Sequence, residues 1–298
     1  MLKETTMIYT IENKHLKISV DTFGAQLMSF YSKDTDVEYL WQGDPKYWTG
    51  RAYNLFPVIG RMYQGFYRAD GKEYRLDCHG LARYYPFELC ARTANKLSFS
   101  LQPTEEMLEK YPYRFTFTVT FRIRDKKLTV EYQVKNEDDK TMYFAFGGHP
   151  GINIPFDGGN FEDYYLEFAE KTPVVRHILS PNKFMADVIQ PYPLQGGVKM
   201  PFRHDLFDDD AVVFGNTCRV CYIKGKGTHR KIKMEYTHYK YLGVWHMDKT
   251  DAPYVCLEPW SALPSTDGKT DDLETKADMF SLAASKTRSS TYSLEIFE

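Results

Sequence analysis

The sequence predicts an all-β protein, a large antiparallel β-sandwich. Most of the chain consists of short runs in which apolar and polar residues alternate with a period of two, and turn residues separate these runs. Helical periodicity is scarce: only residues 104–112 (TEEMLEKYP) form a plausible helix, with Thr104 near its start and Pro112 at its end. Aromatic residues make up 16% of the chain and favour strands. Many short strands with little helix imply packed antiparallel sheets.

The expected strands follow one another along the whole chain. Residues 7–24 contain two strands split at Glu12-Asn13-Lys14, and residues 65–76 form a hairpin around Asp70-Gly71. Residues 113–138 form two longer strands that meet at a turn over 124–127. Further strands are expected within residues 96–103, 141–148, 163–170, 211–216, 219–225, 230–247, 254–260 and 290–297. Residues 181–201 are rich in Pro and Gly, which predicts a long surface loop.

Domain organisation and location follow from composition. No linker-like shift, low-complexity segment or fixed repeat interrupts the chain, so residues 1–298 are expected to form one domain. The net charge is −2 without a basic stripe, which argues against nucleic-acid binding. No apolar run approaches the ~20 residues of a bilayer span, and the first residues do not resemble a signal peptide, so a cytoplasmic protein without a membrane partner is expected.

The five cysteines argue for a reducing compartment. They are Cys78, Cys90, Cys218, Cys221 and Cys256, an odd and scattered set that does not fit a disulfide framework. Cys218 and Cys221 form a C-x-x-C motif, but they lie in a predicted strand that runs into a glycine turn, and no second pair accompanies them. Core cysteines are therefore favoured over zinc binding or redox chemistry.

Two segments place a titratable group in a strand. His149 follows Gly147-Gly148 and precedes Pro150, an arrangement that presents a side chain at the rim of a sheet. Glu258 lies between an apolar run and Pro259, where partial desolvation would raise its pKa and make it a better base. Taken alone, each has a structural alternative: a histidine hydrogen-bonded at a strand end, and a glutamate paired with a lysine or arginine.

Three further groups are candidates of lower specificity. His79 lies in a His-Gly turn within residues 77–83, and such turns are common. Arg61 ends an apolar segment and could either contact sugar hydroxyls or cap a surface turn. Residues 208–210 are three aspartates before a strand; such clusters are most often solvated, and metal binding is disfavoured because neighbouring strand residues alternate faces.

In their order and context these segments resemble the aldose 1-epimerase family, the galactose mutarotases, and within it the LacX-like branch. The resemblance covers nearly the whole chain, and the segment Leu40–Trp48 (LWQGDPKYW) is especially typical of that branch. The other matching segments are ENKHLKISVDTFGAQLMSF, NLFPVIGRM, DGKEYRLDCHGLAR, FGGHPGIN, DDDAVVF, YLGVWH and VCLEPW.

The resemblance implies a β-supersandwich with an open cleft and ring-opening catalysis without a metal or nucleotide cofactor. By motif, His149 matches the family's catalytic acid and Glu258 its catalytic base. For substrate binding, the matches are His79, Arg61, Asp210 and, by position only, Trp260 and Trp245. Residues 60–65 (GRMYQG) depart from the best-studied branch, and the run of three aspartates leaves the register of Asp210 open.

The predicted function is an isomerase that interconverts the α and β anomers of a hexose such as galactose or glucose, acting as a monomer or homodimer. The charge of Glu258 is expected to raise the pKa of His149, and that of His149 to lower the pKa of Glu258.

Three alternatives stay open. A hexose 6-phosphate substrate would need converging cations, for which Arg51, Arg61 and Arg83 are the candidates. A non-catalytic sugar-binding protein would not need an acid–base pair. A glycoside hydrolase or lyase would normally need paired carboxylates.

Overall fold

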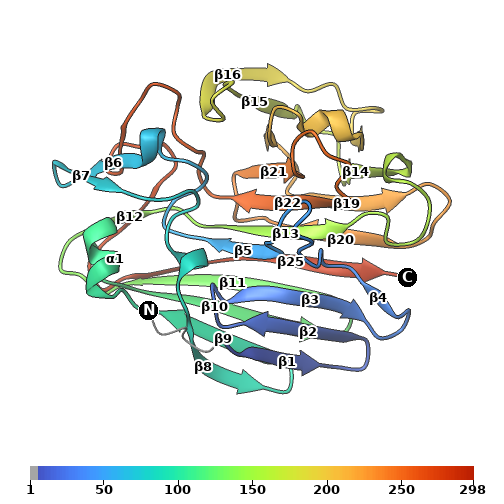
Figure 1. The fold of residues 1–298 in the computed structure, drawn as a ribbon, viewed down its shortest axis with the longest axis horizontal. Helices are drawn as coiled ribbons and strands as arrows, with labels where there is room; N and C mark the ends of the chain where they lie inside the picture. Colours follow the sequence, from blue (N-terminus) through green and yellow to red (C-terminus); the bar gives the residue numbers. More distant parts are fainter. Residues whose placement is uncertain (1–5) are drawn as a thin grey trace.

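Two large antiparallel sheets dominate the computed structural model, which describes residues 6–298 (Figure 1). The nine-stranded sheet has the order β17 (Lys199–Pro201), β14 (Tyr164–Phe168), β19 (Val220–Gly225), β20 (Lys231–Glu235), β25 (Thr287–Phe297), β11 (Lys127–Asn136), β10 (Phe115–Arg124), β9 (Lys96–Leu101) and β8 (Glu88–Thr93). The seven-stranded sheet has the order β16 (Met185–Pro191), β15 (Val175–Leu179), β18 (Val212–Gly215), β21 (Tyr241–Trp245), β22 (Tyr254–Trp260), β13 (Gly147–Asn153) and β5 (Ala52–Leu55). The predicted all-β antiparallel architecture is confirmed.

Smaller elements complete the fold. The small sheets comprise β1 (Ile8–Glu12), β2 (Leu16–Asp21), β3 (Gln26–Ser32) and β4 (Val37–Glu38); β12 (Met142–Phe144) with β24 (Phe280–Leu282); and β23 (Asp271–Asp272) with β6 (Phe66–Ala69) and β7 (Lys72–Arg75). The helical segments are α1 (Glu105–Lys110) and the 3₁₀ turns η1 (Tyr63–Gly65), η2 (Ala82–Tyr84), η3 (Phe161–Asp163) and η4 (His204–Phe207).

Local sequence signals account for several of these boundaries. Asp70 and Gly71 both have positive φ, as a type I′ turn requires, and they join β6 to β7 as predicted. The hydroxyl of Thr104 accepts a hydrogen bond from the Met107 amide at 3.3 Å and caps α1, the predicted helix. The predicted turns between β1 and β2 and between β10 and β11 are also present.

The prediction of a long surface loop over residues 181–201 is wrong. This segment contains β16, which pairs with β15 at the edge of the seven-stranded sheet, and β17, which pairs with β14. Most of β16 faces solvent, so the strand does not need alternating hydrophobicity. An edge strand also tolerates Pro191, since one side of its backbone makes no ladder hydrogen bonds. Neither the hydrophobic pattern nor the composition therefore indicated strand β16.

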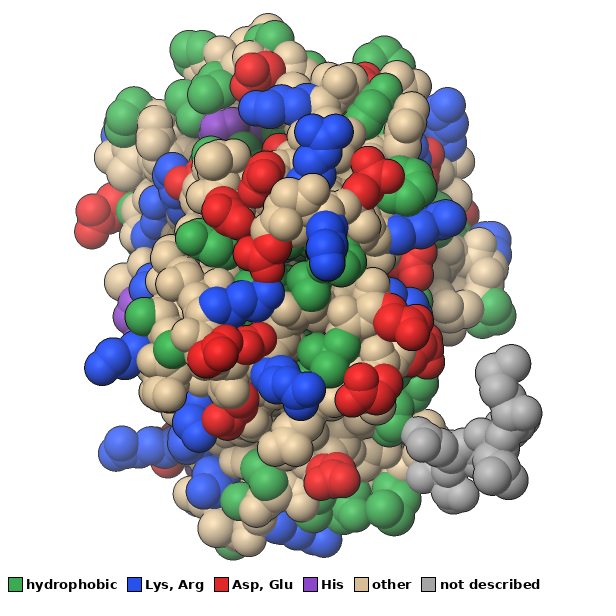
Figure 2. All heavy atoms as spheres, turned by 90° about the vertical axis from the view of Figure 1, so that its left-hand side faces the viewer, with side chains coloured by type: hydrophobic (Ala, Val, Ile, Leu, Met, Phe, Trp, Pro, Cys, Tyr) green, Lys and Arg blue, Asp and Glu red, His purple; other side chains and the backbone are tan. Residues whose placement is uncertain are grey.

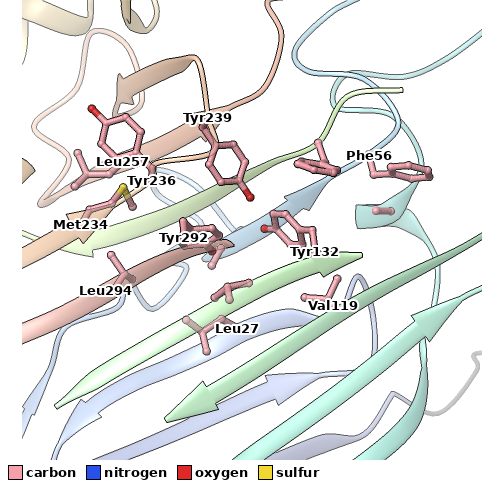
Figure 3. Packing of buried hydrophobic residues seen from close by; sticks show 14 of the residues in the cluster. Leu27, Phe56, Val119, Tyr132, Met234, Tyr236, Tyr239, Leu257, Tyr292 and Leu294 are labelled. Carbon is pink, nitrogen blue, oxygen red and sulfur yellow. The ribbon is translucent and has the colours of Figure 1, made fainter. Parts of the chain in front are cut away.

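The main core lies between the two large sheets, and aromatic rings fill much of it (Figure 3). Leu257 of β22 and Tyr292 of β25 point into this space from opposite sheets. Gly148 of β13 lets the sheets approach closely, because a Cβ at this position would lie 2.7 Å from the Tyr292 ring. The glycine before His149 thus has a packing role.

The C-x-x-C cysteines behave as the sequence predicts for structural residues. Cys221 is fully buried in the core, whereas the thiol of Cys218 donates to the carbonyl of Val220 at 3.2 Å. All five cysteines are free thiols.

The distribution of surface charge and the character of the helices bear on possible partners. On the face in Figure 2, acidic and basic side chains are interspersed. None of the helices within residues 6–298 has the length and apolar character that a bilayer span requires. The opening residues 1–5, part of the segment judged unlike a signal peptide, lie outside the described residues.

Candidate active site

His149 and Glu258 meet on the outer face of the seven-stranded sheet. Strands β13 and β22 are antiparallel, with Gly147 opposite Trp260 and Gly151 opposite Cys256. This register places His149 directly across from Glu258, so the two side chains extend from the same face. The Nε2 atom of His149 lies 3.1 Å from Oε2 of Glu258, and both side chains are more than nine-tenths buried.

Aromatic rings enclose the imidazole of His149. Its ring centroid lies 4.9 Å from that of Trp48, 5.6 Å from that of Trp245 and 5.4 Å from that of His79. Its Nδ1 atom is buried and has no hydrogen-bond partner among the described residues. Burial, with a smaller contribution from the charge of Arg83, lowers the pKa of His149 to about 3. The ring is therefore neutral at physiological pH.

The same desolvation favours the protonated form of Glu258. Burial raises the pKa of Glu258 well above its ordinary value, and the charge of Asp210 adds to this effect. The indole Nε1 of Trp260 donates to Oε2 of Glu258 at 3.2 Å and opposes the shift. The rise in the Glu258 pKa that the sequence predicted from desolvation is confirmed. The raised pKa expected for His149, and the lowering of the Glu258 pKa expected from His149, are wrong, because the cost of burying two charges exceeds their attraction.

A strained turn brings His79 to the pair. His79 and Gly80 both have positive φ, and a Cβ on Gly80 would lie 2.5 Å from the carbonyl oxygen of Phe56. The amide of Gly60 donates to Nδ1 of His79 at 3.1 Å. Burial lowers the pKa of His79 well below its ordinary value. The neutral ring then carries its proton on Nε2, which leaves an N–H donor for a ligand.

A chain of charges lies at the rim. Arg61 Nη1 is 3.3 Å from Oδ2 of Asp210, which is also 3.8 Å from Nζ of Lys183. Lys183 lies 3.1 Å from Asp248 in turn. Asp210 has a φ of 79°, and its Oδ1 accepts a hydrogen bond from the Ala211 amide, which fixes the carboxylate before β18. The two predicted binding residues, Arg61 and Asp210, therefore lie together.

These groups share one cleft with a volume of about 370 Å³. It brings together every predicted site residue: His149, Glu258, His79, Arg61, Asp210 and Trp260. The proposed cleft aromatic Trp245 is there as well. Asp208 and Asp209 instead line an adjoining hollow of about 300 Å³. The three aspartates thus diverge, but they lie in a turn before β18, so the expected alternation of strand faces does not account for their arrangement.

Sequence reasoning gave no role to several further residues of the cleft, among them Trp48, Tyr53, Lys183 and Asp248. Trp48 comes from the loop before β5, where its carbonyl accepts a hydrogen bond from the Trp41 indole at 2.8 Å. Trp48 lies in the segment typical of the LacX-like branch, which was the available signal for it. Lys183 lies in the turn between β15 and β16 that was predicted as part of a loop.

The three arginines named for a phosphate do not converge. Arg61 and Arg83 line the cleft, but Arg51 donates to the Met28 carbonyl and the Gln42 side chain, both at 2.7 Å, outside the cleft lining. The guanidinium of Arg83 stacks 3.9 Å above the ring of Tyr53. Its Nε atom is buried and has no hydrogen-bond partner among the described residues.

One group of side chains in this site has the composition of a metal-binding set. Donor atoms of His149, Cys256 and Glu258 all lie within 4.8 Å of one another. Cys256 is the residue of this group for which the sequence assigned no chemistry.

Comparison with known proteins supplies the family. The aldose 1-epimerase family model matches residues 7–265. The chain belongs to the aldose 1-epimerase family. It is 30% identical over 299 residues to "Protein LacX, chromosomal" of Lactococcus lactis subsp. lactis, with 97% of this chain and 99% of LacX covered. The predicted membership of the LacX-like branch is confirmed.

Solved structures agree with this assignment. A galactose mutarotase-like protein from Lactobacillus casei superposes with a TM-score of 0.92 at 30% identity, over 98% of this chain and all of that one. A galactose mutarotase related enzyme from Lactobacillus acidophilus also gives 0.92, at 31% identity, over 98% of each chain. The fold is therefore galactose mutarotase-like.

Proposed function

We propose that this protein interconverts the α and β anomers of a free aldohexose such as galactose or glucose, with His149 and Glu258 as its acid–base pair. The observation that carries the proposal is the 3.1 Å contact between these two groups in a cleft of about 370 Å³. Family membership supports an epimerase-type reaction. Sugar binding alone does not require a buried acid–base pair, whose burial costs stability.

The reaction needs one proton acceptor and one proton donor at the two oxygens of the anomeric carbon. Glu258 as carboxylate takes the proton of the anomeric hydroxyl, and His149 as imidazolium gives a proton to the ring oxygen. The C1–O5 bond breaks, the aldehyde rotates about C1–C2, and reclosure from the other face gives the second anomer. Reclosure returns both protons, so the pair ends as it began.

Burial favours a neutral His149 and a protonated Glu258, so the proton must first pass from the carboxyl to the imidazole. Both forms of the pair carry the same number of protons, and this transfer across 3.1 Å needs no exchange with solvent. Hydrogen bonds from sugar hydroxyls to Glu258 would stabilise its charged form. The bound sugar therefore helps to create the reactive ion pair.

Substrate recognition is assigned to the surrounding groups. His79 offers an Nε2–H donor, and Arg61 and Asp210 present a donor and an acceptor at the rim. The rings of Trp245 and Trp260 give apolar faces against which a sugar can pack.

The charges in the cleft favour a free hexose over a hexose 6-phosphate. The charges of Arg61 and Lys183 are already balanced by Asp210 and Asp248, so the cleft offers a phosphate little net positive charge from these two cations. Arg83 is the observation that favours the phosphorylated substrate, because its guanidinium lines the cleft and its Nε lacks a partner among the described residues. Glucose 6-phosphate is therefore the second candidate.

The test follows optical rotation or anomeric NMR signals after pure α-galactose or α-glucose is dissolved with the protein. We expect the wild type to accelerate equilibration, and Glu258→Gln and His149→Asn each to lower the enzymatic rate by about 10²–10⁴-fold. Glu38→Gln is the matched control, since Glu38 is a largely buried carboxylate that accepts hydrogen bonds from Phe30 and Leu40 outside the cleft.

Two outcomes would contradict the proposal. If neither sugar equilibrates faster with the wild type, the free-hexose assignment fails, and acceleration with glucose 6-phosphate alone would establish the second candidate. If both variants keep the wild-type rate, the assigned acid–base pair is wrong.

A cytoplasmic location fits the five free thiols and stays a proposal.

A further inference from the structure

We propose that His149, Cys256 and Glu258 form a binding site for a soft divalent cation such as Zn²⁺, and that the bound ion inhibits the enzyme. The metal site depends only on the positions of the three side chains. Inhibition of anomer exchange rests on the proposed function. The acid–base chemistry does not use Cys256, although this buried thiol lies beside both reacting groups.

Strand geometry brings the three donors to one place. Cys256 and Glu258 are two residues apart on β22, so they extend from the same face of the sheet. His149 lies across from Glu258 on β13 and diagonally from Cys256, which pairs with Gly151. The donor atoms lie within 4.8 Å of one another, and those of His149 and Glu258 are 3.1 Å apart.

These distances are close to those of a zinc site. Bond lengths of about 2.3 Å to sulfur and about 2.0–2.2 Å to nitrogen and oxygen place the ligands of a tetrahedral ion roughly 3.3–3.7 Å apart. The imidazole and carboxyl group already satisfy this spacing approximately. The thiol has to approach them by at most about 1.5 Å, a movement within reach of a change in its χ1 angle.

The chemistry of the donors selects the metal. Thiolate and imidazole favour Zn²⁺, Co²⁺ and similar transition metals, whereas Mg²⁺ and Ca²⁺ prefer oxygen ligands. The site supplies three protein ligands, and His149 and Glu258 both line the cleft, so the fourth position faces its opening. Coordination displaces the protons of the Cys256 thiol and of the Glu258 carboxyl group to solvent. The ion then occupies the lone pair of His149 and the carboxylate of Glu258, and neither can exchange a proton with a sugar.

Equilibrium binding of Co²⁺ to the full-length protein tests the site without any assay of activity. Thiolate coordination gives a ligand-to-metal charge-transfer absorption in the near ultraviolet, which we expect with one ion per chain and which Zn²⁺ should abolish by displacement. Cys256→Ser should remove this absorption. Cys78→Ser and Cys90→Ser should retain it, because Cys78 lies in the cleft outside the group and Cys90 is exposed in β8.

The absence of the absorption in the wild type, or its persistence in Cys256→Ser, would overturn the proposal. If Cys256→Ser fails to fold, Glu258→Gln gives an independent test. Loss of this ligand should weaken Co²⁺ binding by about tenfold or more, and unchanged affinity in that variant would equally overturn the site. Mg²⁺ should neither bind at the site nor displace Co²⁺.

The inhibitory consequence is measured by the rate of galactose mutarotation. Zn²⁺ should slow the wild-type enzyme, added galactose should relieve the effect, and Cys256→Ser should be less sensitive relative to its own metal-free rate. An inactive protein that still binds Co²⁺ through Cys256 would leave the metal site standing and refute the proposed function. An active protein that binds Co²⁺ but is unaffected by Zn²⁺ would refute the inhibitory role.

Discussion

Strand pairs β10–β11 and β13–β22 lie in the two large sheets and differ on their outer faces. In β10, buried Phe117 and Val119 alternate with partly exposed Thr116 and Thr118. In β22 all seven residues are buried, and in β13 six of seven are buried. The first pair presents its outer face to solvent, whereas loops cover the outer face of the second and form the cleft there.

This difference changes what a charged pair can do. Arg122 and Glu131 bridge β10 and β11 on the solvent side, where an ion pair contributes about 0–1 kcal/mol. His149 and Glu258 bridge β13 and β22 where both side chains are buried. Burial lowers the pKa of His149 and raises that of Glu258, which favours the neutral form of both groups. A diagonal cross-strand pair thus forms a surface ion pair in one sheet, and a directly opposed pair forms the candidate acid–base pair in the other.

The largest expected effect concerns the inner faces, where the two sheets should behave alike. Leu257 of β22 and Leu294 of β25 are both fully buried in the core between the sheets (Figure 3). Each Leu→Ala substitution should lower the free energy of unfolding by about 2–5 kcal/mol, because it leaves a cavity. Urea denaturation of both variants measures this loss. A much smaller loss for Leu257→Ala would show that β22 is not packed as tightly as the opposing sheet.

A smaller effect of opposite sign should distinguish the outer faces. In the unfolded chain Glu258 ionises above its ordinary pKa of about 4.3, whereas burial raises this pKa in the folded protein, so the free energy of unfolding decreases as pH rises from about 4.3 toward the raised pKa. Glu258→Gln removes this penalty. We expect it to raise the free energy of unfolding at pH 7, since each unit by which burial raises the folded-state pKa costs the wild type about 1.36 kcal/mol once the unfolded carboxyl group is ionised.

The pH dependence and a matched variant make this result specific. The gain from Glu258→Gln should shrink as pH falls toward about 4, where the unfolded carboxyl is also protonated. Glu131→Gln on β11 should instead lower stability by at most about 1 kcal/mol, because it removes an exposed ion pair. If Glu258→Gln instead lowers the free energy of unfolding at pH 7, the inference that a protonated carboxyl group is buried here is contradicted.

The smallest expected effect tests the hydrogen bond from Trp260 to Glu258. Trp260→Phe keeps most of the ring and removes the indole donor that lies 3.2 Å from Oε2. The loss of one such bond, about 1 kcal/mol, should raise the pKa of Glu258 further and lower kcat about fivefold. A change in KM alone, with kcat intact, would assign Trp260 to sugar binding rather than to the carboxyl group.

The strand pairs also show what the sequence could predict. Alternation in β10 and β11 marks one buried and one exposed face, and Asp70-Gly71 and Thr104 mark a turn and a cap through local chemistry alone. The edge strand β16 has no buried face that would impose a pattern, and it was missed.

For the site, the motifs identified residues that meet in the cleft, but they did not identify their neighbours. Trp48 and Lys183 reach His149 and Asp210 from loops about one hundred and about thirty residues away in sequence, so no local pattern marks them. The apolar run before Glu258 predicted that desolvation raises its pKa, but the lowered pKa of His149 was beyond the sequence. The shift of His149 depends on how completely other segments cover its ring, which spacing along one strand does not encode.

The most direct test of this account is the pH dependence of kcat/KM for α-galactose mutarotation from about pH 4 to pH 8, with the uncatalysed rate subtracted. The pair is active while its carboxyl group and its imidazole together hold one dissociable proton. It gains a second only near the lowered pKa of His149, about 3, and loses the first well above the ordinary pKa of Glu258. We therefore predict that kcat/KM does not fall as the pH is lowered from about 6 toward about 4. A fall centred near pH 4.3, the ordinary pKa of a glutamate, would show that the pair takes up its second proton as exposed side chains do, and would contradict the claim that burial controls the pair.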